Sequence, residues 1–381
     1  MSDLTLSGAR LLLADGTIRP GSLVLAEGRI AEISGERAAG LDAGGFLVLP
    51  GIVDLHGDAF ERQLMPRPGV HFEPVAALLE TDRQMLANGI TTAYHALTLS
   101  WEPGLRGIEA ARAFLAALAE ARPLLGADTR LHLRFETFNL EAEGEVLDWL
   151  ASGLIDILAF NEHVDDIGRD IARAKLGTYL GRTRLDEASF VSLFERVRAR
   201  RVDVPAAIGR LAAAARAVGI PMVSHDDDSP ADRRRYRALG CAISEFPVDL
   251  ETARCAIEAD ESVILGAPNV VRGGSHTARL SAAAAAEAGL CTALTSDYYY
   301  PALLQAAYRL AGRGQLDFAQ CWALVSGNPA RAAGLTDRGA IAAGNRADLI
   351  VVDDRDRGLP RVVAAFVAGR LRFAAERLAA F

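Results

Sequence analysis

The central part of the chain alternates between short apolar runs and longer stretches in which apolar residues recur every three to four positions. Short apolar runs are typical of strands buried on both faces, and the longer pattern is typical of helices. The runs predict strands over 48–56, 90–97, 130–137, 155–163, 220–225, 241–246, 262–267 and 291–297. The intervening stretches predict helices over 74–88, 107–121, 141–152, 186–199, 204–218, 230–239, 249–259, 277–289 and 301–312. Eight strand–helix units in series predict an α/β fold, a (β/α)8 TIM-type barrel.

The two ends of the chain have a different pattern. Residues 1–48 contain short alternating runs separated by Asp15-Gly16 and Glu27-Gly28, which predict strands joined by tight turns. Two further runs and a turn follow residue 346. Neither end has enough strands to bury a core alone. We therefore predict one small β-sandwich domain from residues 1–48 plus 340–381, with the barrel formed by 49–339.

Composition restricts the class of protein. Half of the 381 residues are hydrophobic, and the net charge of −8 argues against nucleic acid as a partner. No apolar run approaches the roughly 18 residues of a membrane-spanning helix. The N-terminal residues lack the pattern of a signal peptide, and four widely spaced cysteines suit a reducing compartment. These features predict a cytoplasmic protein that binds neither nucleic acid nor membrane.

Histidines and acids collect at the predicted carboxyl ends of the strands, where barrels of this type hold their chemistry. His56 and Asp58 end the first strand, and residues two apart on a strand point to the same side. A single histidine at such a place is most simply a polar rim residue. Several carboxylates converging on one mouth, however, would repel each other unless cations neutralised them.

We therefore predict a site for two divalent metals about 3.5–4 Å apart with a bridging hydroxide as nucleophile. Mixed histidine and carboxylate ligation favours zinc, with manganese or iron as alternatives. The predicted ligands are His56, Asp58, His225, Asp297, His163 and, as the bridging carboxylate, Glu136, with Glu162 and Glu245 as alternatives for the bridge. Asp297 is also the predicted catalytic base. Lys175, a bridging ligand if carbamylated, is disfavoured because it lies well beyond the fourth strand.

Two arginine-containing loops follow predicted strands. Arg272 precedes Gly-Gly and then Ser275 and His276, so backbone and side-chain donors could together bind an oxyanion. Arg67 lies between two prolines, which restrict its loop. Either loop alone could be a surface turn with a solvated arginine. Together they predict a phosphorylated small-molecule substrate bound by Arg67, Arg272, Ser275 and His276.

The motifs resemble the PhnM family of the amidohydrolase superfamily, which acts in phosphonate catabolism. The resemblance covers the whole barrel and is most specific in the strand-seven loop and in Met65-Pro-Arg-Pro-Gly69. The matching segments are 51–58, 64–69, 89–92, 131–136, 224–227, 244–247, 266–276 and 296–298. It implies a diphosphatase that cleaves alpha-D-ribose 1-methylphosphonate 5-triphosphate to the 5-phosphate and pyrophosphate by attack of a metal-bound hydroxide. It also implies a functional link to carbon–phosphorus lyase proteins, and a homodimer is compatible with such a barrel.

The chain departs from the family pattern after the fourth strand. The family has Asp-His-Thr-Pro-Gly-Gln there, whereas this chain has Asn-Glu-His-Val-Asp-Asp over 161–166. The eighth strand continues into three tyrosines, 298–300. Both changes fall on the substrate side of the site. A paralogue acting on a C–N bond or on a different phosphate ester is therefore the alternative function, and a non-enzymatic scaffold is a third.

Overall fold

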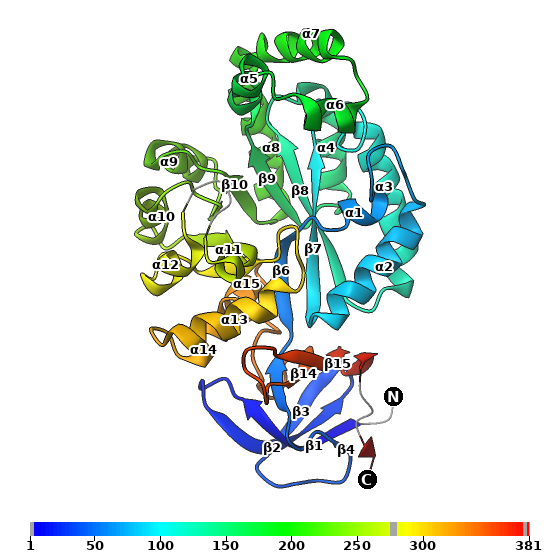
Figure 1. The fold of residues 1–381 in the computed structure, drawn as a ribbon, viewed down its shortest axis with the longest axis vertical. Coiled ribbons are helices and arrows are strands. Elements are labelled where there is room, and N and C mark those ends of the chain that lie inside the picture. The colour runs from blue at the N-terminus through cyan, green and yellow to red at the C-terminus, as the bar shows by residue number, and fades with distance from the viewer. Residues whose placement is uncertain (1–3, 275–279, 376–378, 381) are drawn as a thin grey trace.

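A computed structural model of the chain describes residues 4–274, 280–375 and 379–380. Eight parallel strands follow one another in chain order around a barrel (Figure 1). They are β6 (Ile52–Gly57), β7 (Ile90–Leu99), β8 (Asp128–Glu136), β9 (Ile157–Asn161), β10 (Met222–His225), β11 (Ile243–Glu245), β12 (Ser262–Gly266) and β13 (Ala293–Thr295). The predicted barrel is confirmed, and each predicted strand is present.

The barrel closes between its first and last strands. Gly57 and Asp297 form a parallel bridge. The Asp58 amide donates to the Asp297 carbonyl at 3.0 Å, and the Asp297 amide donates to the His56 carbonyl at 2.9 Å. The closing hydrogen bonds therefore fix the backbone of three predicted site residues.

The predicted helices are present, and most of them surround the barrel (Figure 1). They are α2 (Pro74–Ala87), α3 (Ile108–Ala121), α4 (Glu143–Ala151), α7 (Glu187–Arg198), α8 (Val204–Val218), α9 (Pro230–Ala238), α10 (Leu250–Ile257), α12 (Ala282–Glu287) and α13 (Ala302–Arg313). Residues 277–279 of the helix predicted over 277–289 lie outside the described residues. The sequence did not predict α1 (Glu61–Leu64), α5 (Val164–Ala172), α6 (Gly177–Thr183), α11 (Ala267–Arg272), α14 (Phe318–Ala323) and α15 (Gly327–Ala332).

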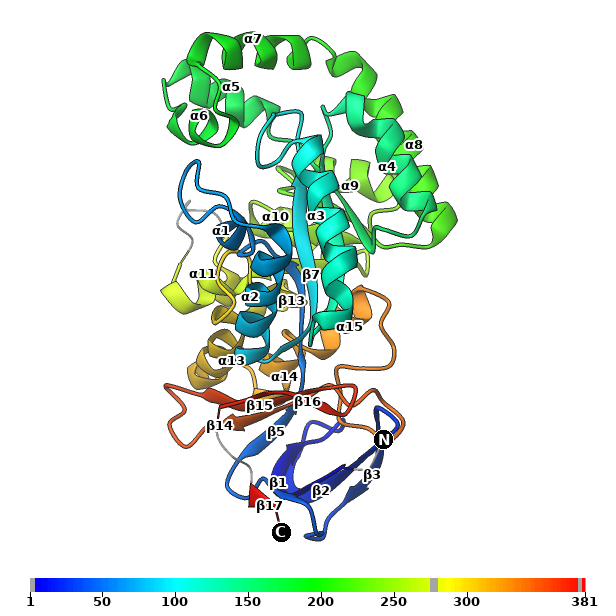
Figure 2. The same ribbon diagram turned by 90° about the vertical axis from the view of Figure 1, so that its right-hand side faces the viewer.

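The two chain ends pair into a second, nine-stranded sheet. Its strands are β1 (Leu4–Leu12), β2 (Ile18–Ala26), β3 (Arg29–Ser34), β4 (Leu41–Asp42), β5 (Leu47–Pro50), β14 (Leu349–Asp353), β15 (Arg361–Val367), β16 (Arg370–Ala374) and β17 (Ala379–Ala380). The part formed by β14–β16 lies across β1–β3 (Figure 2). Leu23, Val48 and Phe366 belong to the buried cluster of this domain. The small β domain from both termini is confirmed, and because β5 extends to Pro50 we propose Gly51 as its boundary.

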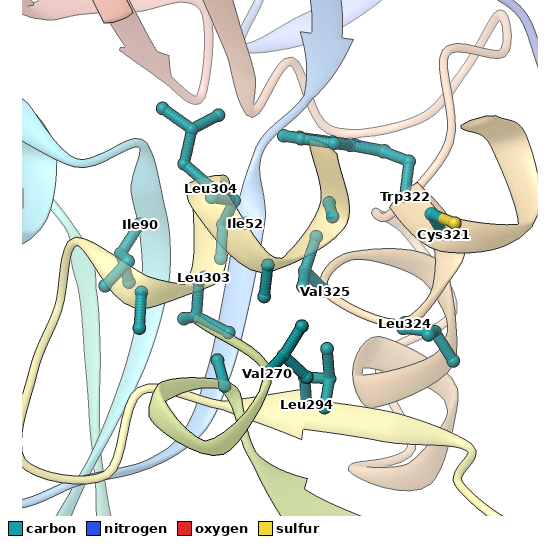
Figure 3. Close-up of a cluster of buried hydrophobic side chains, with 14 of the residues drawn as sticks. Ile52, Ile90, Val270, Leu294, Leu303, Leu304, Cys321, Trp322, Leu324 and Val325 are labelled. Carbon is teal, nitrogen blue, oxygen red and sulfur yellow. The ribbon is translucent and has the colours of Figure 1, made fainter. Parts of the chain in front are cut away.

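Gly51 joins this domain to the first barrel strand. A Cβ atom at this position would clash with the side chain of Thr91, so the close approach requires glycine. The Trp322 indole N–H donates to the Pro50 carbonyl at 3.1 Å. Trp322 also packs in the apolar cluster that joins β6 to α13 and α14 (Figure 3). The strand that carries His56 and leads into Asp58 is thus packed tightly at its amino end.

Candidate metal and phosphate site

All six predicted metal ligands line one cavity of about 790 Å³ at the carboxyl ends of the barrel strands. They are His56, Asp58, Glu136, His163, His225 and Asp297. Parallel strands deliver these side chains to one place because each strand ends on the same rim of the barrel. The barrel therefore brings together residues that are far apart in sequence, from His56 at the end of the first strand to Asp297 after the last.

Left-handed backbone conformations turn the chain at three of these strand ends. Asp226, Phe246 and Asp297 have φ angles of 57°, 54° and 54°. Residues other than glycine seldom adopt this conformation, and it costs of order 1 kcal/mol or more. The hydrogen-bonded barrel holds the backbone in place, and two of the three residues carry carboxylates that line the cavity.

Glu245 lies between two histidines. Its Oε2 atom is 2.8 Å from Nδ1 of His56 and 2.8 Å from Nδ1 of His225. The imidazole rings of these histidines are stacked, with centroids 5.5 Å apart. The Glu245 side chain has no exposed surface. Interactions with both histidines hold its pKa well below the ordinary value, although burial alone would raise it.

Glu136 pairs with His163 instead. The His163 Nδ1 atom is 2.6 Å from Glu136 Oε1, and its Nε2 atom is 3.6 Å from Asp226 Oδ2. The charge of Glu136 raises the pKa of His163 to about 9, although burial would lower it. In return, the attraction of His163 outweighs burial and lowers the pKa of Glu136 to about 2. Without a metal, this pair is therefore an ion pair at neutral pH.

Arg134 brings a positive charge into the same cavity. Its Nη2 atom lies 3.1 Å from Nε2 of His225, and its Nη1 atom lies 3.6 Å from Asp58 Oδ2. The side chain is 9% exposed, so its charge acts in a poorly hydrated place. Arg134 can therefore stabilise negative charge on a bound substrate.

Carboxylate crowding is strongest at Asp297. Burial and the nearby Asp58 charge raise the pKa of Asp297 to about 7. Burial also lowers the pKa of His56 to about 4, so its imidazole is neutral and able to act as a ligand. A divalent cation between these groups would relieve the repulsion between the carboxylates.

The residues fit such a cation. Within the described part of the chain, three clusters have ligand atoms within 4.8 Å of one another: His56, Asp58 and Asp297; His163, His225 and Asp226; and His56, His225 and Glu245. Among the described residues, Glu245 Oε1 and His132 Nε2 are buried without a hydrogen-bond partner. Buried polar atoms are seldom left unsatisfied in proteins. The first two clusters could hold one metal each, and Glu245 lies between them.

The other predicted residues fall in different places. Arg272 lines the cavity, and its Nη1 atom is 3.4 Å from the hydroxyl of Tyr298. Arg67 is exposed and is absent from the described cavity lining. Glu162 pairs with Arg201 at 3.3 Å and belongs to none of the ligand clusters found among the described residues. Ser275 and His276 lie outside the described residues.

Sequence reasoning assigned no role to Asp226 or Arg134 and ranked Glu245 below Glu136. A signal for Arg134 existed, because its strand alternates His132, Arg134 and Glu136 on one face. Asp226 is the first of three consecutive aspartates, and only the turn after β10 selects it. The contact of Glu245 with two histidines depends on the register of strands that are far apart in sequence.

Comparisons with known proteins agree with the fold. An amidohydrolase family model matches residues 198–373. Alpha-D-ribose 1-methylphosphonate 5-triphosphate diphosphatase from Escherichia coli is 32% identical over 356 residues, covering 91% of this chain and 94% of the relative. Adenine deaminase from Methylobacterium nodulans is 27% identical and covers 97% and 60%, respectively. N-acetylglucosamine-6-phosphate deacetylase from Pasteurella multocida has the same fold, with a TM-score of 0.66, 10% identity and coverage of 97% and 100%.

A closed barrel with histidines and carboxylates at its mouth, beside a β domain from both termini, defines a hydrolase of the amidohydrolase type. Within that superfamily, whose members generally bind divalent metals, the chain belongs to the PhnM family, that of the Escherichia coli relative. Among the described residues, no helix has the length and apolar character needed to cross a membrane.

Proposed function

We propose that this protein hydrolyses alpha-D-ribose 1-methylphosphonate 5-triphosphate to the 5-phosphate and pyrophosphate. The observation that carries the proposal is one cavity lined by both the predicted metal ligands and several arginines. A metal-dependent amidase needs only the metal ligands. Arginines are in addition suited to binding a polyphosphate, because their guanidinium groups pair with phosphate oxygens. The reaction named for the Escherichia coli relative joins the two requirements.

Two metals would be held by separate clusters. His56, Asp58 and Asp297 would hold one, and His163, His225 and Asp226 the other, with Glu245 as the shared carboxylate. This choice replaces Glu136, which belongs to none of the three ligand clusters among the described residues. Bound divalent metals of this kind acidify water and polarise a phosphoryl oxygen. Zinc remains the favoured metal, with manganese or iron as alternatives.

The protein's own side chains carry out the remaining steps. In the overall reaction, water adds across the bond between the first and second phosphate groups of the substrate's triphosphate, and pyrophosphate leaves. A carboxylate oxygen of Asp297 accepts the proton of the attacking water. The Arg134 guanidinium, 3.6 Å from Asp58, donates to the phosphoryl oxygens as their charge increases. Arg272 binds phosphate at the rim of the cavity.

The test is a substrate panel with the purified, metal-loaded protein. Phosphorus NMR would follow the ribose 5-triphosphate, and parallel assays would offer N-acetyl amino sugars, cyclic amides and simple phosphate esters. The proposal expects pyrophosphate and the 5-phosphate in equal amounts and negligible amide turnover. The alternative function, hydrolysis of a C–N bond, would instead be established by two results together. The unmodified protein would release no pyrophosphate, and amide turnover would persist in the Arg134→Met and Arg272→Ala variants.

A further inference from the structure

The segment between β9 and α7 forms part of the wall of the cavity. Helices α5 and α6 stand beyond the carboxyl ends of the barrel strands (Figures 1 and 2). The family motif is lost at the start of this segment, where the chain departs from Thr-Pro-Gly-Gln. Its residues in the cavity wall are Asp166, Ile167, Arg169, Asp170, Arg173, Tyr179 and Arg182.

The segment is fixed to the barrel by polar contacts. Arg182 donates to both carboxylate oxygens of Glu102, each at 2.6 Å, in the loop after β7. The Tyr179 hydroxyl donates to Asp170 at 2.9 Å, which joins α6 to α5. The Tyr179 ring also stacks on Phe190 of α7 with centroids 5.5 Å apart. A bidentate arginine–carboxylate pair with little exposure restricts both partners, so the segment is a defined wall of the site.

Most arginines of this cavity have their charge compensated. Arg106 pairs with Glu61 at 2.9 Å, Arg182 with Glu102, and Arg169 with Asp166. Arg173 differs, because its exposed side chain has no ion pair or hydrogen bond within the part of the chain that the structure describes. Its backbone is nevertheless fixed, since its amide donates to the Arg169 carbonyl at 3.1 Å at the end of α5. Arg173 therefore presents an uncompensated guanidinium from an ordered position.

We propose that the α5–α6 segment is the subsite for the outer phosphates of the substrate and that Arg173 determines specificity for a triphosphate. This inference rests on the proposed function. Phosphates next to the ribose would lie at the strand ends with Arg134, and the terminal phosphate would meet Arg173 at the cavity rim. The terminal phosphate leaves as the outer half of pyrophosphate, but the bond that breaks lies between the first and second phosphates. Its contact with Arg173 is therefore nearly the same in the ground state and the transition state, so it acts mainly on KM and changes kcat little.

The experiment compares Arg173→Ala with Lys175→Ala by steady-state kinetics. Both substitutions remove one positive charge from the same exposed segment, but Lys175 is outside the described cavity lining. With the 5-triphosphate, Arg173→Ala should raise KM by about tenfold or more, the size expected for a charge-assisted hydrogen bond, at nearly constant kcat. Arg173→Lys should recover part of this loss, and Lys175→Ala should resemble the unmodified protein. Equal effects of the two alanine variants, or an unchanged KM in Arg173→Ala, would overturn the proposal.

Binding of inorganic phosphates separates this proposal from the proposed function. Calorimetry would measure tripolyphosphate and pyrophosphate binding to the metal-loaded protein and to Arg173→Ala, whether or not any substrate is turned over. The subsite predicts that the unmodified protein prefers tripolyphosphate and that Arg173→Ala loses this preference. The same preference in both proteins, or none in either, would contradict the subsite. Failure of pyrophosphate release alone would contradict only the reaction.

Discussion

His225 and Glu245 stand opposite each other in the register of β10 and β11, and Nδ1 of the histidine is 2.8 Å from Oε2 of the glutamate. Since Glu245 is equally close to His56, this one carboxylate joins the two halves of the candidate metal site. Glu245→Gln should therefore lower bound metal from two equivalents and reduce activity by at least about a hundredfold. Metal analysis after gel filtration, together with the pyrophosphate assay, checks this prediction.

Glu136→Gln is the matched comparison, because Glu136 is also buried and lines the same cavity. Its partner is His163, and it belongs to none of the three ligand clusters. We expect its metal content to fall less than that of Glu245→Gln. Greater metal loss in Glu136→Gln would restore Glu136 as the bridging ligand.

Asp297→Asn tests the catalytic base. The amide keeps the size of the side chain but cannot accept a proton, so kcat should fall by about 10²–10⁴. The expected control result is a thermal unfolding midpoint close to that of the unmodified protein, since the hydrogen bonds that close the barrel at Asp297 come from its backbone. A variant that keeps its full metal content and more than a tenth of the activity would show that another group takes the proton.

The sequence predicted the barrel because most of the eight strands are short apolar runs. It predicted six metal ligands because these residues lie at or just after the carboxyl ends of the strands. It missed α5 because that helix spans only nine residues, although Val164, Ile167 and Ile171 recur at helical spacing, and it missed α6 because that segment contains two glycines. It gave no basis for the proposed choice of Glu245 over Glu136, since each is an acid at the end of a strand. That choice depends on side-chain directions and cross-strand register, which a local pattern does not contain.

A buried arginine stabilises the two strands that carry His225 and Glu245. Arg233 is fully buried, with Nη1 3.3 Å from Asp227 Oδ2 and Nε 3.2 Å from Glu261 Oε2. The same Asp227 oxygen accepts hydrogen bonds from Ser224 and Ser244, the residues that precede His225 and Glu245. Arg233→Met would leave the fully buried Asp227 carboxylate without its cationic partner and should cost about 3–5 kcal/mol of unfolding free energy.

Urea denaturation of Arg233→Met measures this cost. Arg210→Met is the control, because Arg210 pairs with Glu143 on the surface and should lose at most about 1 kcal/mol. Similar losses in the two variants would show that the buried network contributes no more than an exposed ion pair.

At the opposite end of the barrel, the carboxylate of Asp128 makes the stability of the protein depend on pH. Burial would raise the pKa of Asp128, but Arg130 and Arg338 outweigh it and hold the pKa below its ordinary value. The nearer contact is to Arg338 Nη1, at 2.6 Å. Because the folded-state pKa lies below the unfolded one, the stabilisation is complete above the unfolded pKa and is lost as pH falls through the folded value.

Asp128→Asn should therefore be less stable than the unmodified protein at pH 7. The difference between the two should narrow as pH falls below about 4, the ordinary pKa of aspartate. Unfolding free energies from denaturant titrations at several pH values check this. A constant difference across the range would show that Asp128 acts through packing and not through its charge.

Metal-dependent release of pyrophosphate from alpha-D-ribose 1-methylphosphonate 5-triphosphate tests the central claim most directly. The measurement compares metal-loaded protein, protein treated with a chelator, and treated protein resupplied with zinc, while circular dichroism confirms that the fold persists. The account predicts one pyrophosphate and one 5-phosphate per substrate, loss of this release after chelation, and its return with zinc. Release of orthophosphate alone, no release from the metal-loaded protein, or full activity after metal removal would contradict it.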